Sequence, residues 1–169
     1  LQNENTPNVH CVLAPAGCGK SWFVNGITWH LRAEGKIVLN VAASALAATL
    51  LLNGSTAHST FKIPIPATDT SYCGFKAADR ELIRQCSLVC YDEVSMVSAE
   101  IGNMLDRSLQ EIMGNTIPFG GKCIVFLGDF KQLLPVVPGR RDVTTIQNAT
   151  WWSACNVIRF TKNFRALKN

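Results

Sequence analysis

The chain has 169 residues, of which 47% are hydrophobic and 17% are charged, and its formal net charge is +4. This length suits one well-buried domain and excludes two ordinary domains. No apolar run approaches the roughly 20 residues that span a bilayer, which excludes a membrane-spanning helix.

The seven cysteines form no Cys-x-x-Cys pair. An odd set of this kind favours free thiols in a reducing compartment over a disulfide framework or a zinc site. The sequence starts without Met and without a signal-peptide pattern, so we expect a segment of a longer intracellular protein.

The first predicted strand, residues 9–13, runs into a glycine-rich loop that precedes a helical pattern. The loop consists of Ala14, Pro15, Ala16, Gly17, Cys18, Gly19, Lys20 and Ser21. A strand, such a loop and a helix form a phosphate-binding site, because backbone N–H groups and the positive end of the helix dipole converge on one anion. Lys20 is placed to contact the β- and γ-phosphates of ATP, and Ser21 to ligate Mg²⁺. Ala14 stands where the motif has its first glycine, so we expect a slightly altered entry to the loop.

Strands and helices alternate along the rest of the chain. The predicted helices cover residues 21–34, 44–52, 79–85 and 98–113. The predicted further strands are residues 37–41, 87–91, 122–127 and 157–161. Residues 55–66 contain two prolines and are expected to lie outside regular structure. The alternation predicts an α/β fold in one domain, with a doubly wound, mainly parallel sheet and helices on both faces.

Two of these strands are followed by polar residues suited to nucleotide hydrolysis. Asp92 and Glu93 come after the strand at 87–91, at the carboxyl edge where open α/β sheets bind ligands. Asp92 would hold Mg²⁺, and Glu93 would orient and activate the attacking water. Gln132, in the loop after the strand at 122–127, is suited to sensing the γ-phosphate or the attacking water. The alternatives are that the acids only cap the next helix and that Gln132 belongs to an ordinary loop.

Together these motifs resemble the Pif-type (petite integration frequency) DNA helicases, over residues 9–165. The phosphate-binding loop resembles the family's first helicase motif, and the Asp92-Glu93 pair resembles its metal and water motif. The segment that contains Gln132 resembles its γ-phosphate sensor, and Asn163-Phe164-Arg165 its arginine motif. The resemblance implies a P-loop NTPase fold of the RecA-like type, in which Arg165 acts on the transition state of ATP hydrolysis.

The resemblance also covers segments that contact single-stranded DNA in the family, residues 43–48 and 56–64. It implies DNA contacts by Ser44, Thr56, His58, Phe61 and Lys62, with Phe61 available to stack on a base. Taken alone, His58 is equally a loop histidine satisfied by local hydrogen bonds.

The function implied by the resemblance is that of a motor that uses ATP and Mg²⁺ to unwind DNA from 5′ to 3′ in replication, recombination, repair or telomere maintenance. Residues 1–169 would be its first RecA-like lobe, with single-stranded DNA and a second lobe of the same parent chain as partners. We expect a monomer in the nucleus or mitochondrion, without membrane attachment, and little ATP hydrolysis by this lobe alone.

Two other classes of protein remain open at this point. One is a different P-loop enzyme, such as a small-molecule kinase or a GTPase, although a GTPase would need an Asn-Lys-x-Asp motif that Lys162-Asn163 does not supply. The other is a binding module that retains nucleotide affinity without turnover. ATP hydrolysis that rises with single-stranded DNA separates the helicase from both.

Overall fold

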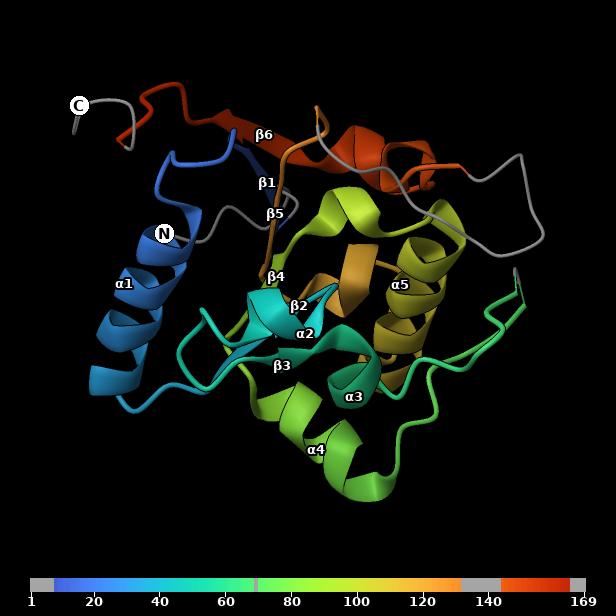
Figure 1. Ribbon diagram of the computed structural model, residues 1–169. Helices are drawn as coiled ribbons and strands as arrows, with labels where there is room; N and C mark the ends of the chain where they lie inside the picture. Colours follow the sequence, from blue (N-terminus) through green and yellow to red (C-terminus); the bar gives the residue numbers. More distant parts are fainter. Residues whose placement is uncertain (1–7, 69, 132–143, 165–169) are drawn as a thin grey trace.

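A six-stranded sheet forms the centre of the computed structural model (Figure 1), which describes residues 8–68, 70–131 and 144–164. The strands are β1 (Val9–Leu13), β2 (Val38–Ala42), β3 (Ser55–Thr56), β4 (Leu88–Asp92), β5 (Ile124–Gly128) and β6 (Asn156–Arg159). Their order is β3-β2-β4-β5-β1-β6, and each neighbouring pair is parallel.

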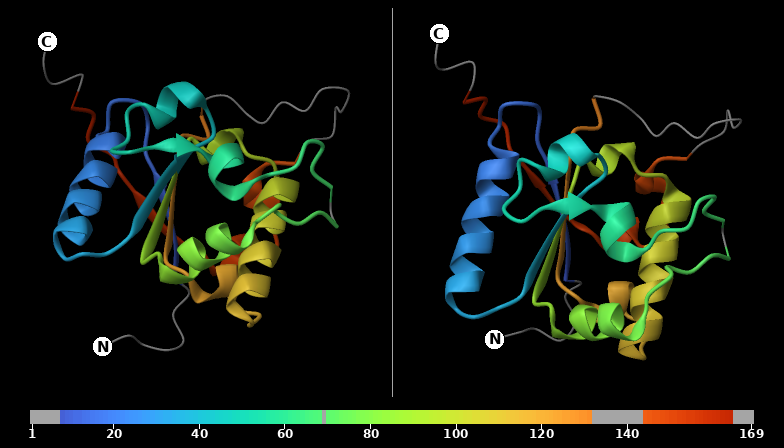
Figure 2. Two further views of the ribbon diagram at one scale, coloured as in Figure 1. Left: turned by 90° about the horizontal axis from the view of Figure 1, so that it is seen from below. Right: turned by 60° about the horizontal axis from the view of Figure 1, so that its bottom comes forward.

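Helices cover both faces of this sheet, with α1 on one side and α5 on the other (Figure 2). The helices are α1 (Lys20–Ala33), α2 (Ala45–Ala48), α3 (Ala57–Phe61), α4 (Ala77–Gln85) and α5 (Ala99–Met113). Four short 3₁₀ turns, η1 (Val94–Met96), η2 (Pro118–Gly121), η3 (Ile146–Asn148) and η4 (Trp152–Ala154), complete the described elements. The doubly wound parallel fold predicted from the sequence is confirmed.

The side chains of each central strand alternate between two hydrophobic cores. In β4, Val89 and Tyr91 pack into the core under α5, whereas Leu88 and Cys90 pack into the core under α1 and α2. All five residues of β4 are buried, as expected for a strand with helices on both faces. This packing fixes the register of the strand that carries the acidic pair.

Parallel pairing also brings the carboxyl ends of the strands to one edge. Leu13 at the end of β1 pairs with Gly128 at the end of β5, and Ala42 at the end of β2 pairs with Asp92 at the end of β4. The loops that leave these strands therefore lie together, although they are far apart in the sequence.

The prediction that residues 55–66 lie outside regular structure is wrong for residues 55–61. Ser55 and Thr56 add β3 to the edge of the sheet, and the Thr56 hydroxyl caps α3 by accepting the Ser59 N–H at 3.3 Å. The prolines begin only at Pro64, after α3 has ended, so they do not interfere with it.

The helix predicted from Ser44 to about Leu52 is shorter than expected. Ser44 is its N-cap, but α2 ends at Ala48 and the chain continues in tight turns, in which the Leu50 and Leu51 N–H groups bond to carbonyls three residues back. Gly54 then passes so close to α2 that a Cβ there would lie 2.3 Å from the Ala48 carbonyl oxygen.

All seven cysteines are free thiols, as predicted. Among the helices of the described residues, none has the length and apolar character needed to cross a membrane.

Replacing Gly120 by alanine is expected to destabilise the fold. Gly120 has φ +65°, and a Cβ there would lie 2.6 Å from Met113 Cγ and 2.7 Å from the Leu109 carbonyl oxygen. The left-handed backbone conformation of an alanine and the overpacking by its Cβ together should lower the free energy of unfolding by about 2–4 kcal/mol. Urea denaturation measures this loss. Gly26→Ala on α1 is the control, because no atom lies within 4 Å of the position that its Cβ would take. This substitution should raise the free energy of unfolding by about 0.5–1 kcal/mol. Equal stability of the two variants would contradict the packing described for η2.

Candidate nucleotide-binding site

The glycine-rich loop between β1 and α1 has the backbone geometry of a phosphate-binding loop. Gly17 and Gly19 both adopt left-handed conformations, with φ of 83° and 84°, which only glycine adopts without strain. Ala14 is buried, donates its N–H to the Gly128 carbonyl at 3.0 Å and does not have a positive φ. Alanine in place of the first glycine therefore requires no strained backbone.

Lys20 folds back over this loop. Its ammonium donates to the Ala14 carbonyl oxygen at 2.7 Å and to the Pro15 carbonyl oxygen at 3.4 Å. These carbonyls hold the positive charge above the loop, next to the first N–H groups of α1, where an anion would be attracted by both.

Asp92 faces the same region from the end of β4. The residue is 4% exposed, and its Oδ1 accepts the Glu93 N–H at 2.8 Å. Burial raises the pKa of Asp92, and the Glu93 N–H and the positive charge of Lys20 offset part of that rise. Among the described residues no cation forms an ion pair with Asp92, so this buried carboxylate is suited to a cation brought in with a ligand.

Glu93 departs from the strand in a left-handed conformation, with φ 56° and ψ 35°. Its carboxylate Oε2 accepts the hydroxyl hydrogen of Ser44 at 2.6 Å. A non-glycine residue in this region of backbone space is strained, and such residues cluster at functional sites.

The loop and the acidic pair line one pocket of about 400 Å³ at the carboxyl edge of the sheet. Its lining includes Ala16, Gly17, Gly19, Lys20, Ser21, Asp92, Glu93, Gly128 and Asp129. The pocket thus brings together five of the eight predicted loop residues with Asp92, predicted to hold the metal, and Glu93, predicted to activate water. Ala14, Pro15 and Cys18 do not line it.

The predicted DNA-contacting residues are only partly available. Phe61 is fully buried, with its ring centroid 6.4 Å from those of both Phe75 and Tyr91, so the prediction that it stacks on a base is wrong. Its apolar ring is held in the core under α5 because α3 packs against the sheet there. His58 and Lys62 are exposed on α3 and at its end.

Ser44 and Thr56 are both half-buried and act as N-caps of α2 and α3. Gln132 and Arg165, the predicted γ-phosphate sensor and arginine of the site, lie outside the described residues.

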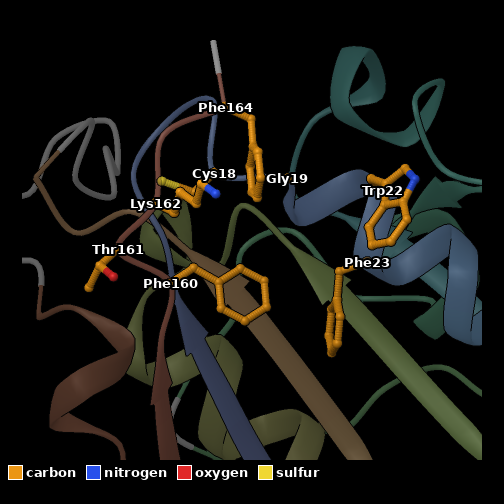
Figure 3. Close-up of a pocket in the computed structure, with 8 residues that line it drawn as sticks. All are labelled: Cys18, Gly19, Trp22, Phe23, Phe160, Thr161, Lys162 and Phe164. Atoms are coloured by element: carbon orange, nitrogen blue, oxygen red, sulfur yellow. The ribbon is translucent and has the colours of Figure 1, made fainter. Parts of the chain in front are cut away.

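A second pocket, which the sequence analysis did not predict, lies beside the loop (Figure 3) and has a volume of about 690 Å³. It is lined by Cys18, Gly19, Trp22, Phe23, Phe160, Thr161, Lys162 and Phe164. The Phe23 and Phe160 rings meet edge to face at 5.3 Å, and the Phe164 N–H donates to the Gly17 carbonyl at 3.0 Å. Trp22 and Phe23, the aromatic pair directly after Ser21, are the sequence signal for this pocket, although their place in a helical pattern is equally typical of packing residues.

Comparisons with known proteins find one family model and several relatives that match this chain. The model of the PIF1-like helicase family matches residues 2–169. The Pif1 protein of Psychrobacter sp. (strain PRwf-1), an ATP-dependent DNA helicase, is 31% identical over 146 residues, which cover 82% of this chain and 22% of that protein. PIF1 of Danio rerio is 29% identical over 166 residues, covering 92% of this chain and 26% of the relative.

Solved structures of Pif1 helicases share the fold. The Bacteroides Pif1 helicase in complex with ADP-AlF3 and ssDNA matches with a TM-score of 0.81 at 30% identity, over 97% of this chain and 40% of that chain. The Pif1 helicase from Candida albicans matches with a TM-score of 0.81 at 26% identity, over 96% of this chain and 38% of that chain.

The chain spans less than half of the length of each of these relatives, from 22% of the Psychrobacter protein to 40% of the Bacteroides chain. The family match, by contrast, extends over almost the whole of this sequence. The chain belongs to the PIF1-like helicase family.

Proposed function

We propose that residues 1–169 form the first RecA-like lobe of an ATP-dependent DNA helicase that hydrolyses ATP to unwind DNA from 5′ to 3′. The observation that carries the proposal is the meeting of the phosphate-binding loop with Asp92 and Glu93 in one pocket. A related Bacteroides helicase has been solved with ADP-AlF3 and ssDNA, which supports the same two ligands here.

In this proposal ATP binds with its phosphates against the loop. The backbone N–H groups at the start of α1 point to the phosphates, and Lys20 exchanges the Ala14 and Pro15 carbonyls for β- and γ-phosphate oxygens. The exchange is favourable because an ammonium bonds more strongly to a charged phosphate than to a neutral carbonyl.

The pocket also fits Mg²⁺. Ser21 and Asp92 line the same pocket and supply a hydroxyl and a carboxylate, the hard oxygen ligands that Mg²⁺ prefers. No group of three or more His, Cys, Asp or Glu that could hold a metal occurs among the described residues, which agrees with an ion held largely by nucleotide phosphates and water. When bound, Mg²⁺ would neutralise the charge that develops on the phosphates.

Glu93 would accept hydrogen bonds from the attacking water and orient it toward the γ-phosphate, since Glu93 lines the same pocket as the loop. Gln132 would sense the γ-phosphate and Arg165 would stabilise the transition state, as the family resemblance implies.

We further propose that the aromatic pocket beside Gly19 receives the base of the nucleotide, because Phe160 and Phe164 offer flat apolar faces within reach of the loop.

Single-stranded DNA would run along the loops that follow β2 and β3. Ser44 and Thr56 lie at the ends of these paired strands, and His58 and Lys62 are exposed next to them. These polar and basic side chains can contact phosphates, whereas base stacking must come from residues other than Phe61.

The parent protein is proposed to close a second lobe over the ATP pocket and to act as a monomer. One related structure concerns two coordinating Pif1 helicases at forked dsDNA, so two copies on one fork are compatible with a monomeric unit.

Free thiols and eukaryotic relatives support action inside the cell, in the nucleus or mitochondrion, in replication, recombination, repair or telomere maintenance.

Lys20→Ala is expected to weaken ATP binding about 10- to 100-fold, because it removes charge-assisted hydrogen bonds to the phosphates. Binding of a fluorescent ATP analogue, measured by anisotropy, checks this. Lys36→Ala is the matched control, since Lys36 pairs with Glu34 at the opposite end of α1. Equal loss in both variants would show that the loop is not the phosphate site.

Glu93→Gln in the full-length protein is expected to lower DNA-stimulated ATP hydrolysis by about 10²- to 10⁴-fold while ATP binding is retained, because the amide cannot accept a proton from water. Turnover with and without single-stranded DNA is the readout, and Glu81→Gln, on the exposed side of α4, is the control. Wild-type hydrolysis that is indifferent to DNA would overturn the helicase proposal, and absence of hydrolysis would favour a binding module.

Lys62→Gln is expected to reduce the salt dependence of single-stranded DNA binding. Loss of one phosphate contact should lower the slope of log K against log salt by about 0.7. Lys36→Gln should leave the slope unchanged, since Lys36 lies between α1 and β2 at the amino edge of the sheet. If wild type and Lys62→Gln show the same salt slope, Lys62 does not contact a DNA phosphate.

A further inference from the structure

The hydroxyl of Ser44 connects the two proposed ligand sites. Its hydrogen is donated to Glu93 Oε2 at 2.6 Å, and its oxygen accepts the Ala47 N–H at 3.2 Å as the N-cap of α2. A serine hydroxyl has a single hydrogen, and in this structure that hydrogen is committed to the Glu93 carboxylate.

The position of Ser44 in the sheet explains why it can reach both sites. It follows β2, whose last residue, Ala42, pairs with Asp92 on one side and with Thr56 on the other. The pairing continues one residue further, because the Ala43 N–H donates to the Asp92 carbonyl at 3.1 Å. Ser44 thus stands between the strand that carries the acidic pair and the segment proposed to contact DNA.

A DNA phosphate can bind Ser44 only in competition with Glu93. Phosphate oxygens are acceptors, so a hydrogen bond between a phosphate and the Ser44 hydroxyl must take the hydrogen now donated to Glu93. While that bond lasts, it occupies an acceptor position of the Glu93 carboxylate that would otherwise be open to water. It also holds the Glu93 side chain toward α2.

We propose that Ser44 restrains Glu93 in the absence of DNA and that a DNA phosphate, by taking the Ser44 hydroxyl, frees the Glu93 carboxylate to orient the attacking water. Ser44 is then a positioning residue that makes ATP hydrolysis depend on DNA. The inference rests on the proposed function, because it assigns the regulation of that same ATP site.

The test is steady-state ATP hydrolysis by the full-length protein, with kcat and KM measured with and without oligo(dT). Ser44→Ala should raise the DNA-free kcat about 10- to 100-fold, the range expected when a hydrogen bond to a charged group is lost. The KM for ATP should stay the same, and added DNA should then give little further stimulation. Ser44→Thr, which keeps the hydroxyl, should behave as wild type.

Ser44→Gly separates the restraint from helix capping. Glycine is accepted at N-cap positions almost as well as serine and has no side-chain hydroxyl to donate to Glu93, so it should also raise the DNA-free kcat. A wild-type DNA-free rate in Ser44→Gly, or a lower rate with and without DNA in a folded Ser44→Ala protein, would overturn the inference. Wild-type protein that DNA does not stimulate would instead overturn the proposed function.

Discussion

The site depends on the parallel register of β1, β5 and β4, which places the phosphate-binding loop and the acidic pair on either side of the end of β5. Gly128, the last residue of β5, makes this approach possible. A Cβ on Gly128 would lie 3.0 Å from Val94 Cγ1 and 3.1 Å from the Ser95 nitrogen. Because a glycine stands there, the turn after Glu93 can pack over β5, and Asp92 and Glu93 line the same pocket as Lys20.

Much of this arrangement could be predicted from local sequence. The strand, loop and helix around Lys20 follow one another without interruption. The helix predicted over residues 98–113 is also present, with Ser98 as its N-cap and Met113 as its last residue. The errors arose where tertiary packing decides. Phe61 is surrounded by polar residues in the sequence, and only its contacts with Phe75 and Tyr91 reveal that it belongs to the core. The bond between Ser44 and Glu93 joins residues 49 positions apart, so no local pattern could have indicated it.

The proposed ATP and DNA sites lie close together at one edge of the sheet. Loops after β1, β4 and β5 line the proposed ATP pocket together with Ala47 and Leu50 after β2, and the segments after β2 and β3 carry the proposed DNA contacts. Since β2 lies directly between β3 and β4, a side chain at its end can contact both. Ser44 occupies that place and bonds to Glu93, so the two proposed ligands would be coupled over a short distance through one side chain.

The most direct measurement on this chain is amide hydrogen exchange with and without ADP and Mg²⁺. If the loop after β1 binds the phosphates, backbone N–H groups in residues 14–22 should exchange more slowly when nucleotide is present, because these groups donate to phosphate oxygens. Amides in the short segment after β6 that hydrogen-bonds to the loop should also gain protection. Unchanged exchange over residues 14–22 at saturating nucleotide would contradict a phosphate site in this loop.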